Sequence, residues 1–205
     1  MATIARNATS NSFRDLIVKN STINFSGGNA IDMRQRDNLN LVFENLSINN
    51  TNNNGIQAGA GCLNSSVRNV STYNTGVLIG MIAKDVNFSP FAINVGAKNV
   101  VIENCSVKNS GYVGIASMGD SVIIQNNLVD TVSYVLDDGS GIYYNNGSGN
   151  TTTSGIKIRN NIVKNSIGAP LGGGTVIVSY GEGIYLDDNS NGVEVSGNTV
   201  TNSAK

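Results

Sequence analysis

Three segments, LVFENLSI (41–48), VVIENCSV (100–107) and VIIQNNLV (122–129), share the pattern that decides the fold of this chain. Each begins with alternating apolar residues, passes through a polar residue to an asparagine, and ends on a second alternation. Alternation with a period of two is typical of β-strands that bury one face. Because the pattern recurs along the chain, the sequence is an array of repeats. The other copies are LIVKNSTI (16–23), SSVRNVST (65–72), MIAKDVNF (81–88), IKIRNNIV (156–163) and VEVSGNTV (193–200).

The residue at the centre of each repeat is asparagine or a close substitute. Asparagine tolerates the left-handed backbone of a sharp corner, and stacked side-chain amides can hydrogen-bond from one repeat to the next. We therefore expect these residues to form a structural ladder at one corner of the fold. They are Asn20, Asn45, Asn69, Asp85, Asn104, Asn126, Asn160 and Gly197.

A second pattern, a small residue followed by a short apolar strand, lies between the asparagine-centred repeats. Two short strands in each repeat predict a solenoid, in which coils stack about 4.8 Å apart and share one core. The segments are NAIDM (29–33), NGIQAG (54–59), TGVLIG (75–80), FAINVG (91–96), VGIASMG (113–119), SGIYY (140–144) and EGIYL (182–186).

Composition excludes several function classes. The 205 residues carry 13 Lys and Arg against 14 Asp and Glu, a net charge of -1. Nucleic-acid binding needs a basic face, so we expect no nucleic-acid partner. The chain has no histidine, which excludes a Ser-His-Asp triad and a histidine-ligated zinc site. Cys62 and Cys105 form no CxxC motif, and we expect two small buried apolar residues, with a disulfide left open.

No targeting or membrane segment is visible. No apolar stretch approaches the roughly 18 residues of a transmembrane helix, so we expect no membrane span. The start, MATIARNATSNSF, lacks the apolar region of a signal peptide. We expect either a protein made without a leader or a domain of a longer secreted chain.

From about Phe13 to Val200 the chain resembles the right-handed parallel β-helix superfamily, the pectate-lyase-like fold. The asparagine-centred repeats and the strands GIYY (141–144) and GIYLDD (183–188) carry this resemblance. It implies an all-β, single-stranded, right-handed parallel β-helix of about eight coils, one domain over residues 1–205 with an irregular lead-in at 1–12. Its members are mostly polysaccharide lyases, glycoside hydrolases, epimerases, phage tailspikes and bacterial surface proteins. The resemblance therefore implies a polysaccharide partner at an extracellular, cell-surface or virion location, and names no reaction.

Two insertions interrupt the regular coils in the C-terminal half. They are NNGSGNTTTSG (145–155) and GAPLGGGTVIVSYGEG (168–183). Loops that leave a solenoid often carry its function, and we expect these to wall a groove. The alternative is that both are tolerated surface excursions.

Aligning SGIYY with EGIYL brings polar and aromatic residues of neighbouring coils together. Tyr143 then stacks on Tyr185, and Ser140 stacks on Glu182. The two tyrosines should point outward as a platform for a sugar, or else only stabilise the sheet. The alignment also stacks Asn145 and Asn146 on Asp187 and Asp188.

Carboxylates concentrate around these two strands. Extended geometry would place Asp138 and Glu182 roughly 8 Å apart, with room for a water, as in inverting glycosidases. We therefore take Asp137, Asp138 and Glu182 as catalytic candidates, and Asp187 and Asp188 as substrate-binding candidates together with the tyrosines. All the aspartates also suit ordinary turns. A Ca²⁺ site is a further reading, but no calcium-motif spacing supports it, so we expect no cofactor and no metal.

The residue before each central asparagine should stack as well. The charges largely alternate, which favours pairing between coils on a solvated face. A lyase would recruit Lys157 or Arg159 as its base, yet nothing in the sequence places them beside the carboxylates. The stacked residues are Lys19, Glu44, Arg68, Lys84, Glu103, Gln125, Arg159 and Ser196.

These features favour a glycoside hydrolase that acts on a polysaccharide through clustered carboxylates. The alternatives are a non-catalytic structural or glycan-binding solenoid of a bacterial surface or phage tail, and a polysaccharide lyase. Because open coil ends expose strand edges, we expect further chain, adjoining domains or a homo-oligomer to cover them. The expected core includes Ile17, Ile23, Val42, Ile48, Ile93, Ile102, Ile115, Ile124, Ile142, Ile158 and Ile184.

Overall fold

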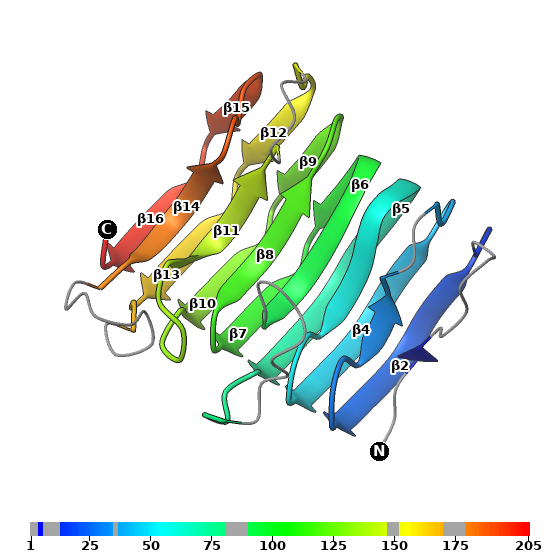
Figure 1. Cartoon of the computed structure of the whole chain (residues 1–205), viewed down its shortest axis with the longest axis horizontal. Helices are drawn as coiled ribbons and strands as arrows, with labels where there is room; N and C mark the ends of the chain where they lie inside the picture. The colour runs from blue at the N-terminus through cyan, green and yellow to red at the C-terminus, as the bar shows by residue number, and fades with distance from the viewer. Residues whose placement is uncertain (1–3, 6–12, 35–36, 81–89, 147–151, 170–178) are drawn as a thin grey trace.

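The chain folds into a stack of parallel β-strands, as Figure 1 shows. Every strand pair found among the described residues is parallel, as expected for successive coils that rise along one axis. The described part contains no helix that is long and apolar enough to span a membrane. The computed structural model describes residues 4–5, 13–34, 37–80, 90–146, 152–169 and 179–205.

The strands form three faces around one core. The first face consists of residues 17–19 of β2 (Ile17–Ser26), 42–44 of β4 (Val42–Thr51), 66–68 of β5 (Ile56–Thr75), 100–103 of β6 (Phe91–Glu103), β9 (Val122–Gln125), β12 (Ile156–Arg159) and β15 (Val193–Ser196). The second consists of the C-terminal parts of β2, β4 and β5 with β7 (Ser106–Ser110), β10 (Leu128–Val132), β13 (Ile162–Ser166) and β16 (Thr199–Ser203). The third consists of β1 (Ile4–Ala5), β3 (Ile31–Met33), the N-terminal parts of β5 and β6, β8 (Val113–Met118), β11 (Gly139–Asn145) and β14 (Gly181–Asp187).

The register of the first face shows that the described part holds seven stacked coils, where the sequence predicts about eight. Arg68 of β5 pairs directly with Glu103 of β6, so no coil lies between them. The repeat expected at 81–88 lies outside the described residues. The stacked residues are Lys19, Glu44, Arg68, Glu103, Gln125, Arg159 and Ser196.

The core residues expected from the sequence are wrong in the first two coils. The expected core residue Ile17 is 58% exposed, and the next coil's Val42 is half-buried, whereas Val18 and Phe43 are buried. In each coil before the last, the buried residue lies two positions before the corner, as Ile102, Ile124 and Ile158 do. The alternation of buried and exposed residues, counted back from the corner residue, thus determines which side chains face the core. Ile184, in the last coil, is partly buried because no further described coil covers it.

The central residues of the repeats lie at corners with left-handed backbone. Asn20, Asn45 and Asn69 have φ of 53°, 53° and 52°. The Nδ2 of Asn45 donates to Oδ1 of Asn20 at 3.0 Å, and that of Asn69 donates to Oδ1 of Asn45 at 3.1 Å. Asp85 of the same series lies outside the described residues. The later corners with positive φ are Asn104, Asn126, Asn160 and Gly197.

A second, buried asparagine ladder lies inside the coil, and the sequence analysis missed it. Asn127 and Asn161 are buried, and Oδ1 of Asn161 accepts the backbone N–H of Asn127 at 3.0 Å. Oδ1 of Asn198 accepts the N–H of Asn161 in the same way, at 2.9 Å. These amides satisfy backbone groups that would otherwise be buried without partners. In the pairs Asn126-Asn127 and Asn160-Asn161, the second residue therefore turns inward while the first forms the corner.

The two cysteines are buried and free. Cys62 is 0% exposed and Cys105 is 2% exposed, and they form no disulfide. Burial raises the pKa of the Cys105 thiol to about 11, and it also raises that of Cys62. Both therefore act as small apolar core residues, as the sequence predicts.

Candidate functional site

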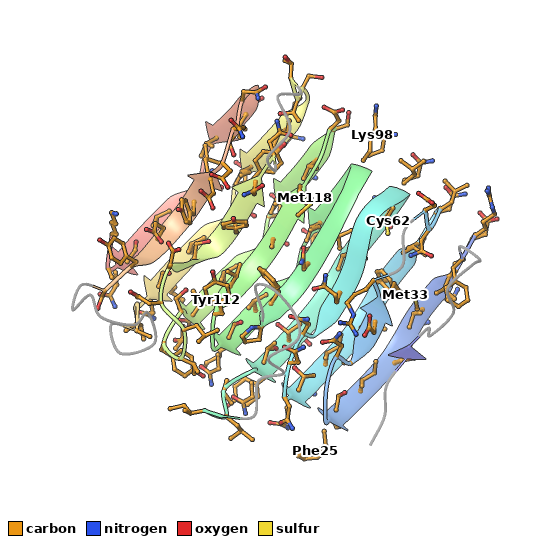
Figure 2. All side chains as sticks on the ribbon, in the orientation of Figure 1. Phe25, Met33, Cys62, Lys98, Tyr112 and Met118 are labelled. Carbon is orange, nitrogen blue, oxygen red and sulfur yellow. The ribbon has the colours of Figure 1, made fainter. Side chains whose placement is uncertain are left out.

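A cavity of about 410 Å³ lies on the outer side of the third face. It extends from β5 across β6, β8 and β11 to the end of β14. Figure 2 shows Tyr112 and Met118, which lie at opposite ends of β8 and both line the cavity. The lining residues are Gln57, Phe91, Asn94, Tyr112, Val113, Ala116, Ser117, Met118, Asp138, Tyr143, Asn145, Asp187 and Asp188.

Stacking of the coils places these side chains. Ile142 is buried in the core, so its neighbour Tyr143 points outward, as alternation requires. The pairing of Tyr143 with Tyr185 and of Ser140 with Glu182 confirms the register predicted from the sequence. The outward ladder continues toward the N-terminus through Ala116, Asn94 and Gln57.

Aromatic and apolar groups form part of the cavity wall. The rings of Tyr143 and Tyr185 meet edge to face with centroids 5.5 Å apart. The ring centroids of Phe91 and Tyr112 lie 5.9 Å apart, and both rings pack with Val113. The hydroxyl of Tyr112 donates to the backbone carbonyl of Asp138 at 2.9 Å, which fixes this aspartate relative to the wall. Such a surface suits the apolar face of a sugar ring.

Asp187 is held as a carboxylate. Its Oδ2 accepts the hydroxyl of Tyr143 at 2.6 Å, and its Oδ1 accepts the N–H of Asp188 at 2.8 Å. Burial alone would raise the pKa of Asp187, but these bonds, with help from Tyr185 and Asn145, hold the pKa below its usual value. Asp187 therefore keeps its negative charge into the acidic range.

Asp138 shows the opposite shift. It directly precedes β11 with φ of 59°, is exposed, and lines the same cavity as Asp187. Burial raises the pKa of Asp138, and the negative charges of Asp187 and Asp137 raise it further, against the opposing charge of Lys205. Asp138 is therefore the cavity carboxyl group that holds its proton most readily.

Asp137, a catalytic candidate from the sequence, is buried and engaged by the backbone. Its Oδ1 accepts the N–H of Ala169 at 2.9 Å and the N–H of Tyr180 at 2.8 Å. These two amides flank residues 170–178. Asp137 does not line the cavity, and its hydrogen bonds fix the backbone at Ala169 and Tyr180 next to the residues that precede β11.

Glu182, the third catalytic candidate, lies beside the cavity without lining it. Its Oε2 is buried and has no hydrogen-bond partner among the described residues. Burial raises the pKa of Glu182, and the charge of Asp138 adds to the effect. Of the substrate-binding candidates, Tyr143, Asp187 and Asp188 line the cavity, whereas Tyr185 contacts it through Tyr143.

The basic residues considered for a lyase lie elsewhere. Lys157 and Arg159 belong to β12 on the first face, and Nε of Arg159 donates to Oε1 of Gln125 at 2.9 Å. Within the described ranges, no group of three or more acidic or cysteine side chains is arranged to hold a metal ion.

Several cavity residues were missed from the sequence. Gln57 and Asn94 line its N-terminal end, where Nδ2 of Asn94 donates to Oε1 of Gln57 at 3.2 Å. Continuing the alignment of the two tyrosines through the earlier coils would have found both amides. Phe91 is the first residue of β6 and Tyr112 directly precedes β8, so neither belongs to the outward ladder that contains Tyr143.

One comparison with known proteins gave a match. The family described as the right handed beta helix region matches residues 4–200. No curated protein and no solved structure matches the chain.

Proposed function

The chain belongs to the right-handed β-helix family, and from that premise we propose that it is a glycoside hydrolase that acts on a polysaccharide at the third-face cavity. In this proposal Asp138 is the general acid and Asp187 is the carboxylate that acts as base or nucleophile. The proposal places the protein where polysaccharides occur, outside the cell, on its surface or on a virion.

The opposite pKa shifts of Asp138 and Asp187 carry this proposal. Two carboxyl groups in one cavity have pKa values pushed apart, one upward by burial and like charge, the other downward by hydrogen bonds. That separation is what a pair needs when one member must donate a proton and the other must stay ionised. A purely structural coil has no use for such a pair.

Each neighbour then has a definite part in the reaction. A sugar ring rests on the aromatic wall, and protonation of the glycosidic oxygen by Asp138 starts bond cleavage. Tyr143 donates to Asp187 and keeps its carboxylate oriented, so Tyr143 is a positioning residue. Asp137 holds the backbone at Ala169 and Tyr180, and the charge of Asp138 raises the pKa of Glu182.

A non-catalytic glycan-binding solenoid is the second candidate. The low fraction of charged residues, 13%, and the regular coils support this reading. A lyase has less support, because none of the described Lys or Arg side chains lines the cavity.

Two substitutions test the hydrolase proposal. Asp138→Asn and Asp187→Asn should each lower turnover by about 10²–10⁴, the usual contribution of a general acid or base. Turnover is measured as reducing ends and as unsaturated products released from a polysaccharide panel. Asp37→Asn is the matched control, because Asp37 is exposed, has φ of 66° and lies outside the cavity.

Release of reducing ends, lost in both variants and kept in the control, supports the hydrolase. Unsaturated products would instead identify a lyase. Full activity in Asp138→Asn refutes the assignment of the acid. Glycan binding without any product favours the non-catalytic solenoid.

A further inference from the structure

The cavity combines three carboxyl groups with uncharged polar and apolar groups. Asp138, Asp187 and Asp188 gather at its C-terminal end, and the amides of Gln57 and Asn94 lie at its N-terminal end. Among the described residues, no Lys or Arg side chain lines it. A ligand that fills this space therefore meets negative charge, amides and aromatic rings.

Neighbouring cations are occupied by other groups. An adjoining hollow shares Met118 and contains Lys98, whose Nζ lies 3.8 Å from Oδ2 of Asp120. Lys205 lowers the pKa of Asp138, but its Nζ lies 4.3 Å from the ring centre of Tyr180. Neither lysine is among the residues that line the cavity.

We propose that the cavity selects glycans without carboxylate, sulfate or phosphate groups, and that its three carboxyl groups exclude acidic glycans. This inference rests on the proposed carbohydrate function and specifies its substrate class. Like charges brought together in a partly enclosed cleft repel strongly, because the surrounding protein screens them less than water does. Uncharged hydroxyl groups can instead use the amides and carboxylates as hydrogen-bond partners.

The amide end of the cavity defines where selectivity can be changed. Asn94 lies two coils from Tyr143 along the outward ladder, about 10 Å away at the usual coil spacing. A cation at this position would face a glycan without touching the proposed catalytic pair. Asn94→Lys should therefore admit an acidic chain.

The experiment compares one polysaccharide in a neutral form and in a negatively charged form. The neutral polysaccharide that binds best is oxidised at its primary hydroxyls to carboxylates, and both forms are titrated calorimetrically into the full chain at pH 7. The oxidised form should bind at least about tenfold more weakly, and the gap should narrow as salt shortens the Debye length from about 30 Å to 8 Å.

Three variants separate charge from shape. Asn94→Lys should restore about tenfold in affinity for the oxidised form, and Asp188→Asn should restore a smaller part. Thr201→Lys makes the same charge change as Asn94→Lys at an exposed residue of β16 outside the cavity, and should restore nothing.

The outcomes distinguish the two proposals. Preference for an acidic glycan overturns the substrate class and leaves the hydrolase standing. Preference for a neutral or amino glycan without turnover supports the substrate class and overturns the hydrolase. An Asn94→Lys protein that gains nothing for the oxidised form overturns the electrostatic selection. Binding of no glycan overturns both.

Discussion

The first and third faces are built from the same coils, yet their charged side chains are arranged in opposite ways. On the first face, Oε1 of Glu103 accepts a hydrogen bond from Nε of Arg68, and its Oε2 accepts one from Nε2 of Gln125. Both donor–acceptor distances are 2.6 Å. On the third face, Asp138, Asp187 and Asp188 line one cavity in which no described cation takes part.

This difference separates stability from function. Pairing on the first face lowers the pKa of Glu103, through the bonds from Gln125 and Arg68, so its charge favours the folded state. On the third face the pKa of Asp138 is raised, so its charge opposes folding. The same fold therefore pairs its stacked charges on the first face and leaves three acids together on the third, the arrangement on which the proposed function rests.

The largest effect is expected at Asp137, beneath the third face. Asp137→Ala removes the acceptor of two backbone amides and should destabilise the protein by about 2–5 kcal/mol in urea unfolding. Asp137→Asn keeps an acceptor oxygen and should retain most of the stability and the activity. Loss of turnover in Asp137→Asn without loss of stability would instead make Asp137 catalytic.

A smaller effect is expected at Glu103 on the first face. Glu103→Gln should lower the free energy of unfolding by about 1–2 kcal/mol at neutral pH. Because the folded pKa is lowered, this stability is present above the unfolded pKa and is lost as pH falls through the folded pKa. Denaturant unfolding across that range should therefore show the variant and the parent converging in acid. Glu194→Gln, at an exposed residue of β15, should show no comparable loss.

Asp138→Asn should change stability in the other direction. Asparagine accepts the left-handed backbone at this position, and the substitution removes one negative charge from a group of acids. The melting temperature should therefore stay level or rise. The gain in the free energy of unfolding should be no more than about 1 kcal/mol. Because folding raises the pKa of Asp138, the gain in stability is present at pH values above the pKa of the folded state. It disappears at pH values below the pKa of the unfolded state, where Asp138 is protonated in both states. A clear loss of stability would mean that Asp138 is a structural turn residue.

The smallest effect concerns the link between Tyr143 and Asp187. Tyr143→Phe removes one bond that lowers the pKa of Asp187, so the acidic limb of the activity profile should move up by about 0.5–1 pH unit. The alkaline limb, which reports Asp138, should stay in place. An unchanged acidic limb would show that Asp187 is not the essential base.

The sequence was sufficient for the fold and for the register of the candidate site. Local alternation and the asparagine corners fix how coils stack, and the pairing of Asn145 with Asp187 follows from them. The expected core positions Ile17 and Val42 are wrong by one residue, because alternation counted back from Asn20 and Asn45 buries Val18 and Phe43 instead.

The chemistry of the site was less accessible from sequence. The contact between the Tyr143 hydroxyl and Asp187 depends on side-chain direction across two coils. The contacts of Asp137 depend on where the second insertion returns to the coil. Neither follows from a repeat pattern, so Asp137 was grouped with catalytic residues and Asp187 with substrate-binding residues.

The coil-to-coil pairing tolerates very different lengths of chain between stacked partners. Paired residues are separated by 25 positions in the first coils, by 22 between Glu103 and Gln125, and by 37 between Asn161 and Asn198. The extra residues leave at corners, where they do not disturb the ladders. Segments between stacked strands could thus be exchanged for others without redesigning the core, which makes this solenoid a modular scaffold on which new specificities can be assembled.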